Sequence, residues 1–360
     1  MDIASPPFLH QTLRLSDFDY EFPRELIATY PAEPRDAARL MVVDRAAGTI
    51  EHRTVQDLPE YFGEGDVLVA NDTMVFPARL RGTKEKTGAK VEVFLLRELN
   101  AENRLWDAVV DPARKIRVGN KLLFDDGLSA EVIDNTTSRG RTLRFIFEGS
   151  PEALYETIDR IGETPIPPYL RRPSEPADKV RYQTVFAEHR GAVAAPAAGL
   201  HMTPALLRSL AERGAEVTTV TLHSGLGSFK PVEVEDLSKH SMDSECFRVS
   251  DDAVACVNRA LTSSDATVTA CDTTVVRALE STLSVDKTLR AGQGWTDKFI
   301  YPTYDFHVTE RLLANFHQPR SPLFMMKAAF AGYGLPRHAY EEAIREEYRL
   351  FAFGDAMLIL

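Results

Sequence analysis

The chain has 360 residues, of which 44% are hydrophobic and 26% are charged, and its formal net charge is −11. This composition excludes wholesale disorder and a fibrous chain, and the length favours two domains. The acidic balance argues against indiscriminate nucleic-acid binding, which needs a broad positive surface, but it allows a local basic patch.

The cysteines and the start of the chain give no indication of export. Cys246, Cys256 and Cys271 form no CxxC motif and lack the cysteine–histidine spacing of a zinc site, so we expect reduced thiols. No apolar run approaches the roughly 20 residues that cross a bilayer. The first residues, MDIASPPFLH, lack the pattern of a signal peptide. We therefore expect a soluble, cytoplasmic protein.

The first 75 residues predict short helices and strands. Residues 23–26 indicate a helical turn, and residues 39–53 predict a hairpin with a glycine at its turn. Residues 67–70 are typical of a short buried strand, which ends in Asn71 and Asp72. Polar residues directly after a buried strand often carry chemistry in α/β proteins, but Asn-Asp is equally ordinary in turns.

Residues 75–147 predict a small antiparallel barrel or sandwich inserted into the chain. Turn signals with glycines separate short β-like runs at residues 75–80, 90–97, 105–110, 121–124, 130–133 and 142–147. Basic residues gather in this segment, among them Arg79, Arg114 and Lys115. They form either solvated faces, as most charge runs do, or a surface that contacts phosphate groups.

The proline-rich residues 162–182 predict an extended connector that returns the chain to the first domain, because proline fixes φ and blocks helices and inner strands. The connector carries Arg171 and Arg172 beside Tyr169 and Tyr182. Basic groups among aromatic rings suit single-stranded RNA. A linker with ordinary solubilising charge fits the composition as well.

The second half of the sequence predicts strands that lead through polar or glycine-containing loops. In residues 191–204, GAVAAPAAGLHMTP, small side chains allow close approach of the backbone, and the threonine–proline pair is typical of a helix start. Strands are expected at 216–222 and 267–270, helices at 204–214, 274–280, 321–330 and 339–351, and an apolar tail at 357–360.

Histidines in these loops predict a general acid–base site, because histidine exchanges protons near neutral pH. They are His201, His223 and His317, with Asp72, Asp297, Arg277 and Arg320 as candidate partners. A packed histidine is the alternative for His201, and a metal site is the alternative for the set. No pair has the HExxH spacing, so we predict no metal. The sequence also lacks a GxGxxG turn and a Walker loop, which argues against dinucleotide and P-loop enzymes.

Further segments identify a family by their order and spacing. They are VLVANDTMVFPARLRGTKEKTGAKVEVFLLREL, WDAVVDPARKIRVGN, IGETPIPPYL, RYQTVFAEHRGAVAAPAAGLHMTPALL, TLHSGLGSFKPVEVEDLSKHSMDSE, DTTVVRALES, GWTDKFIYP and NFHQPRSPLFMM. Together they resemble the S-adenosylmethionine:tRNA ribosyltransferase-isomerase family of queuosine biosynthesis over nearly the whole chain.

The resemblance implies a mixed α/β main domain, residues 1–72 and 160–360, with an inserted antiparallel β-barrel domain, residues 73–159, and an active site in the cleft between them. It implies transfer of the ribosyl part of S-adenosylmethionine to 7-aminomethyl-7-deazaguanine at the wobble position of tRNA. Epoxyqueuosine forms, and adenine and methionine are released. S-adenosylmethionine would be a consumed co-substrate, with no cofactor, membrane or obligate protein partner.

The resemblance also suggests roles for the histidines. A base must remove a proton beside the positive sulfur, which stabilises the resulting ylide. His201 is the first candidate for this base, with His223 and His317 in reserve. Phe229 and Asp297 would hold the adenine and assist its departure, which requires a protonated Asp297.

Binding roles follow from the same resemblance. Arg277 or Arg320 would clamp the donor's methionine carboxylate. The other expected donor contacts are Ala195, Gly199, Gly225, Gly227, Phe229 and Thr273. The expected tRNA contacts are Asn71, Asp72, Arg79, Arg114, Lys115, Arg171 and Arg172.

Two other functions stay open at this point. One is a paralogue that binds the anticodon loop or S-adenosylmethionine without turnover. The other is a methyltransferase with the same donor, although the glycine-rich dinucleotide-type turn is missing. The sequence departs from the family pattern at Ala197, Asp272, Pro322 and Lys327, where threonine, glycine, threonine and a small or apolar residue are usual.

Overall fold

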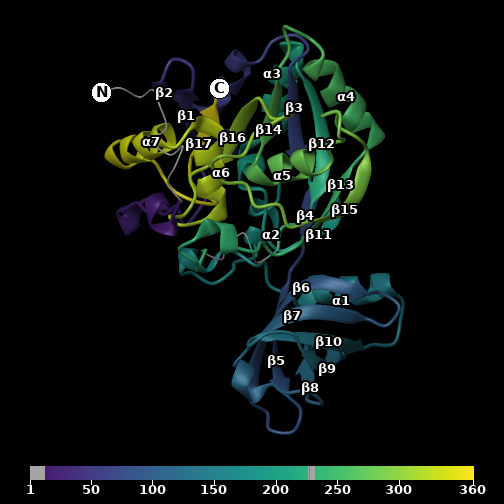
Figure 1. The fold of residues 1–360 in the computed structure, drawn as a ribbon. Coiled ribbons are helices and arrows are strands. Elements are labelled where there is room, and N and C mark those ends of the chain that lie inside the picture. The colour runs from purple at the N-terminus through teal and green to yellow at the C-terminus, as the bar shows by residue number, and fades with distance from the viewer. Residues whose placement is uncertain (1–12, 226, 228–231) are drawn as a thin grey trace.

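A computed structural model describes residues 13–225, 227 and 232–360. Within these residues, the larger body is built on a nine-stranded sheet with the order β15-β13-β12-β3-β14-β16-β17-β1-β2 (Figure 1). Its strands are β1 Arg39–Asp44, β2 Thr49–Thr54, β3 Val67–Asn71, β12 Glu216–Leu222, β13 Glu245–Val249, β14 Val268–Cys271, β15 Gly292–Thr296, β16 Arg311–Asn315 and β17 Ala356–Ile359. Strands β12, β3, β14 and β16 run parallel. Their carboxyl ends therefore meet at one edge of the sheet.

The centre of the sheet is buried on both faces, as expected for parallel strands. The helices of the larger body include α3 Pro204–Glu212, α4 Asp251–Leu261, α5 Thr273–Ser281, α6 Pro322–Ala331 and α7 Gly334–Arg345. Alternate residues of β3 belong to different cores: Val67 and Val69 lie in the core that contains residues of α4 to α7, while Leu68 and Ala70 lie in the core that contains residues of α3. None of the described helices is long and apolar enough to cross a membrane.

A closed six-stranded barrel forms the smaller body and confirms the predicted antiparallel insertion. Its strands are β5 Arg79–Lys84, β6 Lys90–Asn100, β7 Leu105–Asp111, β8 Lys121–Phe124, β9 Ser129–Asn135 and β10 Gly140–Ile146. The helix α1 Pro151–Ile161 packs on the barrel core through Leu154 and Ile158. The two bodies are joined near β4 Thr73–Val75 and β11 His189–Ala192, which pair in parallel (Figure 1). The exact domain boundaries stay a prediction.

Short 3-10 helices occur between these elements in the described chain. They are η1 Leu15–Phe18, η2 Arg24–Leu26, η3 Arg35–Ala37, η4 Val55–Tyr61, η5 Ala113–Lys115, η6 Asp125–Gly127, η7 Pro168–Leu170, η8 Ala197–His201 and η10 Leu237–Lys239. The proline-rich connector is not extended throughout, because it contains η7 and the helix α2 Asp178–Arg181.

Several element boundaries differ from the sequence predictions. The expected helix at 339–351 begins earlier, at Gly334, and ends at Arg345. Pro336 lies in its first turn, where a missing N–H removes no helical hydrogen bond. The expected strand at 75–80 is divided between β4 and β5. Helices α1 and α4 were not predicted, although Ser150 and Ser250 cap them by accepting hydrogen bonds from backbone N–H groups.

The junction after α1 predicts a destabilising substitution, Gly162→Ala. A Cβ atom at Gly162 would lie 2.2 Å from the carbonyl oxygen of Pro77 and 2.7 Å from that of Ile158. Because backbone atoms cannot give way cheaply, we expect a loss of about 2 kcal/mol in urea unfolding. Gly63→Ala is the control, since nothing lies within 4 Å of the corresponding position. Equal stability of the two variants would contradict this account of the junction.

Candidate active site

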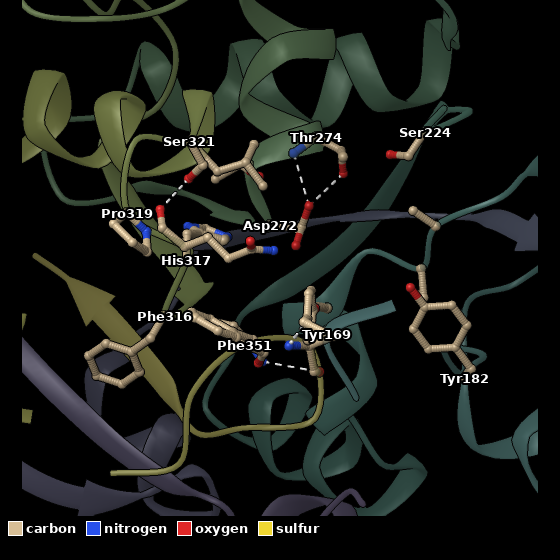
Figure 2. Close-up of a pocket in the computed structure, with 18 residues that line it drawn as sticks. Tyr169, Tyr182, Ser224, Asp272, Thr274, Phe316, His317, Pro319, Ser321 and Phe351 are labelled. Atoms are coloured by element: carbon tan, nitrogen blue, oxygen red, sulfur yellow. Dashed lines mark hydrogen bonds between the residues drawn. The ribbon is translucent and has the colours of Figure 1, made fainter. Parts of the chain in front are cut away.

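A cavity with about 720 Å³ of empty space, including solvent at its mouth, lies at the carboxyl edge of the parallel strands. Such a location is typical of small-molecule sites in α/β proteins. Its lining residues come from segments far apart in the chain and are shown in Figure 2. They include Tyr169, Tyr182, Ala194, Ala195, Ala197, Ser224, Asp272, Thr273, Thr274, Asn315, Phe316, His317, Gln318, Pro319, Ser321, Leu323, Phe351 and Ala352.

Asp272 forms the cavity wall where β14 ends and α5 begins. Its carboxyl group accepts hydrogen bonds from the backbone N–H of Thr274 (3.0 Å), the Thr274 hydroxyl (2.8 Å) and the backbone N–H of Ala198 (3.3 Å). The residue is buried and has φ 101° and ψ 150°, a conformation that favours glycine. Burial raises the pKa of Asp272, while its hydrogen bonds and the charge of Lys327 oppose this rise.

Asn315 ends β16 and connects several cavity walls. Its Oδ1 lies 3.0 Å from Nε2 of His201, at the end of η8. Its Nδ2 donates to the carbonyl oxygens of Phe351 (2.9 Å) and Ala352 (3.3 Å). Its own carbonyl accepts a hydrogen bond from Lys327. The side chain and backbone of this one buried residue therefore hold three other segments in place.

Lys327 is a fully buried amine on α6, behind the cavity. Besides its bond to Asn315, its Nζ lies 3.2 Å from the hydroxyl of Tyr340 and 5.4 Å from the ring centre of Phe316. Burial lowers the pKa of Lys327 to about 7, and the charge of Asp272 opposes this shift. Because burial is the larger effect, this amine changes its charge near neutral pH.

His317 is the predicted histidine that borders the cavity. Its backbone N–H donates to the Tyr340 hydroxyl (2.8 Å), and its carbonyl accepts from the Tyr20 hydroxyl, so its position is fixed. Its Nδ1 is buried without a hydrogen-bond partner among the described residues. Burial, assisted by the charge of Lys327, holds the pKa of His317 well below its usual value. The lowered pKa favours the neutral imidazole, which has a ring nitrogen that can accept a proton.

His201 and His223 lie outside the cavity lining. His201 is buried behind Asn315, and burial lowers its pKa, although the hydrogen bond that its Nε2 donates to the Asn315 Oδ1 opposes this shift. His223 lies against Gly191, and its Nδ1 is 2.8 Å from the Thr73 hydroxyl. Burial also lowers the pKa of His223. The sequence correctly predicts that these loops follow strands at one edge of the sheet. Of the three predicted histidines, however, only His317 lines the cavity.

The expected donor-binding residues divide into two groups. Ala195 and Thr273 line the cavity. Three others are described but do not line the cavity: Asp297 is exposed, Gly199 lies close to the Thr184 side chain, and Gly227 lies near Asp243. Phe229 lies outside the described residues.

Both arginines expected to clamp a carboxylate already have acidic partners. Arg277 forms a buried ion pair with Glu245 and donates to the carbonyl of Thr296 (3.2 Å). Glu245 also accepts a hydrogen bond from the backbone N–H of Gly225 (2.8 Å). The backbone N–H of Gly225, which was expected to contact S-adenosylmethionine, therefore already has a partner within the protein. Arg320 is on the surface and pairs with Asp19. The long sequence separations of these partners explain why the pairs were missed.

Most of the expected tRNA-binding residues also have structural partners. Asn71 and Asp72 are buried; Asn71 donates to Thr274 (2.9 Å), and Asp72 accepts from Thr221 (2.6 Å). Arg79 pairs with Glu92 (2.8 Å), and Arg172 binds both carboxylate oxygens of Asp178 (2.7 Å each). Exposed positions are occupied by Arg114, Lys115 and Arg171.

The aromatic wall of the cavity was not recognised in the sequence as part of a donor site. Tyr169 and Phe351 pack edge to face at 5.1 Å, and the Tyr169 hydroxyl accepts from the backbone N–H of Ala352 (3.3 Å) (Figure 2). From the sequence, the tyrosines of the proline-rich connector are expected to contact only RNA. No group of three or more metal-ligating side chains suited to a metal ion occurs within the described ranges.

An open mixed sheet with a cavity at its carboxyl edge is the arrangement typical of α/β proteins that bind small molecules. The chain belongs to the queuosine biosynthesis protein family, whose model matches residues 15–359. It is 56% identical to the S-adenosylmethionine:tRNA ribosyltransferase-isomerase of Flavobacterium psychrophilum and 55% identical to that of Cytophaga hutchinsonii. Each match covers 97% of this chain and 100% of the relative.

A solved structure supports the same family assignment. The crystal structure of S-adenosylmethionine tRNA ribosyltransferase from Thermotoga maritima is 33% identical in sequence. It matches with a TM-score of 0.53 over 96% of this chain and 100% of that chain. The mixed α/β fold with a barrel is therefore shared with a member of the family.

Because Lys327 is buried, we expect the free energy of unfolding to depend on pH, and we expect Lys327→Met to remove this dependence. With a pKa of about 7 in the folded protein and roughly 10.4 when unfolded, the unfolded chain binds more protons between these values. The folded state therefore gains stability as the pH rises above 7, by up to about 1.4 kcal/mol per pH unit. Urea unfolding at pH 7 and pH 9 measures this gain. A wild-type-minus-variant difference that is independent of pH would contradict it.

Proposed function

We propose that this chain transfers the ribosyl part of S-adenosylmethionine to 7-aminomethyl-7-deazaguanine at the wobble position of tRNA. Epoxyqueuosine is formed, and adenine and methionine are released. Membership of the queuosine biosynthesis family and the names of its relatives support this reaction. In this proposal S-adenosylmethionine is consumed as a co-substrate, no cofactor takes part, and the protein acts in the cytoplasm, where it meets its tRNA.

The cavity at the carboxyl edge of the sheet carries the proposal for the donor site. It offers the aromatic rings of Tyr169, Tyr182 and Phe351 as apolar contacts and Ser224, Asp272 and His317 as polar ones. This combination suits a nucleoside with a charged sulfur, because aromatic rings attract cations and pack against flat bases. The small side chains of Ala194, Ala195 and Ala197 leave room for close approach of the backbone.

His317 is the base in this proposal. The reaction needs removal of a proton from a carbon beside the positive sulfur, and a neutral imidazole is suited to accept it. Burial favours the neutral form of His317, which borders the cavity, whereas His201 and His223 lie outside its lining. The role first expected for His201 is therefore assigned to His317.

The proposed tRNA surface lies on the exposed basic residues of the barrel and the connector. Arg114 and Lys115 occur together on η5, and Arg171 lies at the end of η7. These side chains are exposed, unlike Arg172, which is committed to Asp178. Basic groups of this kind hold phosphates and position the nucleic acid without reading its sequence.

One assay tests the proposed reaction. The protein is incubated with S-adenosylmethionine and tRNA that carries the 7-deazaguanine precursor, and the products are analysed by mass spectrometry. We expect free adenine, free methionine and tRNA that has gained the ribosyl-derived group. Release of S-adenosylhomocysteine with methylated RNA would identify a methyltransferase instead, and binding without adenine release would identify a non-catalytic paralogue.

His317→Gln should lower ribosyl transfer by at least about a hundredfold, the usual contribution of a catalytic base, with donor and tRNA binding nearly unchanged. Single-turnover rates and separate binding titrations measure the two effects. His338→Gln, an exposed position on α7, is the matched control. Full turnover in His317→Gln would exclude this role, and loss of turnover in His201→Gln alone would return it to His201.

Replacement of Arg114 and Lys115 by glutamine should weaken tRNA binding without a change in affinity for S-adenosylmethionine. Each lost phosphate contact should also lower the slope of log affinity against log salt concentration by about one. Filter binding at several salt concentrations measures both quantities. Lys287→Gln, in an exposed loop of the larger body, is the control. An unchanged salt slope in the double variant would place the RNA on another surface.

A further inference from the structure

Asp272 is an unusual residue to form the wall of a cavity. It is a buried acid in a backbone conformation, φ 101° and ψ 150°, that side chains rarely adopt. This backbone holds the carboxyl group at the cavity wall, next to Thr273 and Thr274 at the beginning of α5 (Figure 2). A strained, buried acid in such a place suggests a use beyond packing.

The hydrogen bonds of Asp272 leave its charge without a direct counter-ion. Among the described residues, its hydrogen-bond donors are two groups of Thr274 and the backbone N–H of Ala198, and these donors are neutral. Lys327 acts on it electrostatically, but the amine is bonded to the Asn315 carbonyl and to Tyr340. Buried carboxylates are normally paired with a cation. A bound cation would supply this pairing and favour the ionised form.

The other walls of the cavity also suit a cation. Tyr169, Tyr182 and Phe351 present aromatic rings to the same space, and such rings attract positive charge. S-adenosylmethionine carries a positive charge on its sulfur, whereas S-adenosylhomocysteine, otherwise alike, has a neutral sulfur. The cavity therefore has two independent features, the carboxyl group and the rings, that favour the charged compound.

We propose that Asp272 binds the sulfonium group of S-adenosylmethionine and selects the charged donor over its neutral thioether. This inference rests on the proposed function and adds a specificity-determining residue to it. The simpler role of Asp272 is to cap α5, which it does by accepting from the Thr274 N–H. A helix cap needs an acceptor oxygen but no charge, so the two roles are separable.

Asp272→Asn separates charge from capping. Asparagine keeps an acceptor for the Thr274 N–H and tolerates positive φ better than most residues, but it has no negative charge. Asp272→Gly is a second variant without the charge, and it relieves the backbone strain. Asp265→Asn, at an exposed position before β14, is the matched control because it removes an acid at the opposite end of the same strand.

Isothermal titration of the full-length protein with S-adenosylmethionine and with S-adenosylhomocysteine tests the proposal. We expect both Asp272 variants to bind S-adenosylmethionine about tenfold more weakly, as for the loss of one charged contact. Affinity for S-adenosylhomocysteine should stay within about twofold of the wild type, because its sulfur offers no charge to Asp272. The control should match the wild type with both compounds.

An unchanged preference between the two compounds in folded Asp272 variants would overturn the inference and leave Asp272 as a helix cap. If the wild type also forms the expected tRNA product, that result leaves the proposed function intact. If the wild type binds neither compound and forms no product, both the proposed function and this inference fail. Circular dichroism of each variant checks that the fold is retained.

Discussion

The hydrogen bonds of Asn315 are the interaction on which the cavity depends. This residue ends β16 and is buried. Its side-chain amide accepts a hydrogen bond from His201 and donates to the backbone carbonyls of Phe351 and Ala352. Its own backbone carbonyl accepts a hydrogen bond from the amine of Lys327. A buried polar group must find such partners or lose stability. The segments that supply them are thereby fixed around one space.

This network explains why His201 and His317 differ although both lie in loops at the same edge of the sheet. His201 uses its Nε2 to contact Asn315 and belongs to the support of the cavity. His317 is held through its backbone by the hydroxyls of Tyr20 and Tyr340, and its imidazole takes no part in these two hydrogen bonds. The buried pair of Arg277 and Glu245 acts in the same supporting way beside β15. Support and chemistry are therefore carried by different residues.

The sequence predicted the elements better than the side-chain contacts. Regular turn spacing predicted the barrel, and the helix starts at Thr203 and Ser321 are confirmed by hydrogen bonds from Leu206 and Phe324. These signals are local in the chain. Side-chain partners depend on the fold instead. Asn315, the partner of His201, lies 114 residues away in the sequence. Asp178 is close to Arg172 in sequence, but it contacts Arg172 only because the chain turns and begins a short helix between them. Periodicity places a loop at an edge, but it does not orient the side chains.

A crystal structure of the protein with S-adenosylmethionine bound tests the account most directly. We expect the donor in the cavity between α5 and the rings of Tyr169 and Phe351, with its sulfur beside Asp272 and an adjacent carbon within reach of His317. A donor bound at another site, with this cavity filled only by water, would contradict the central claim.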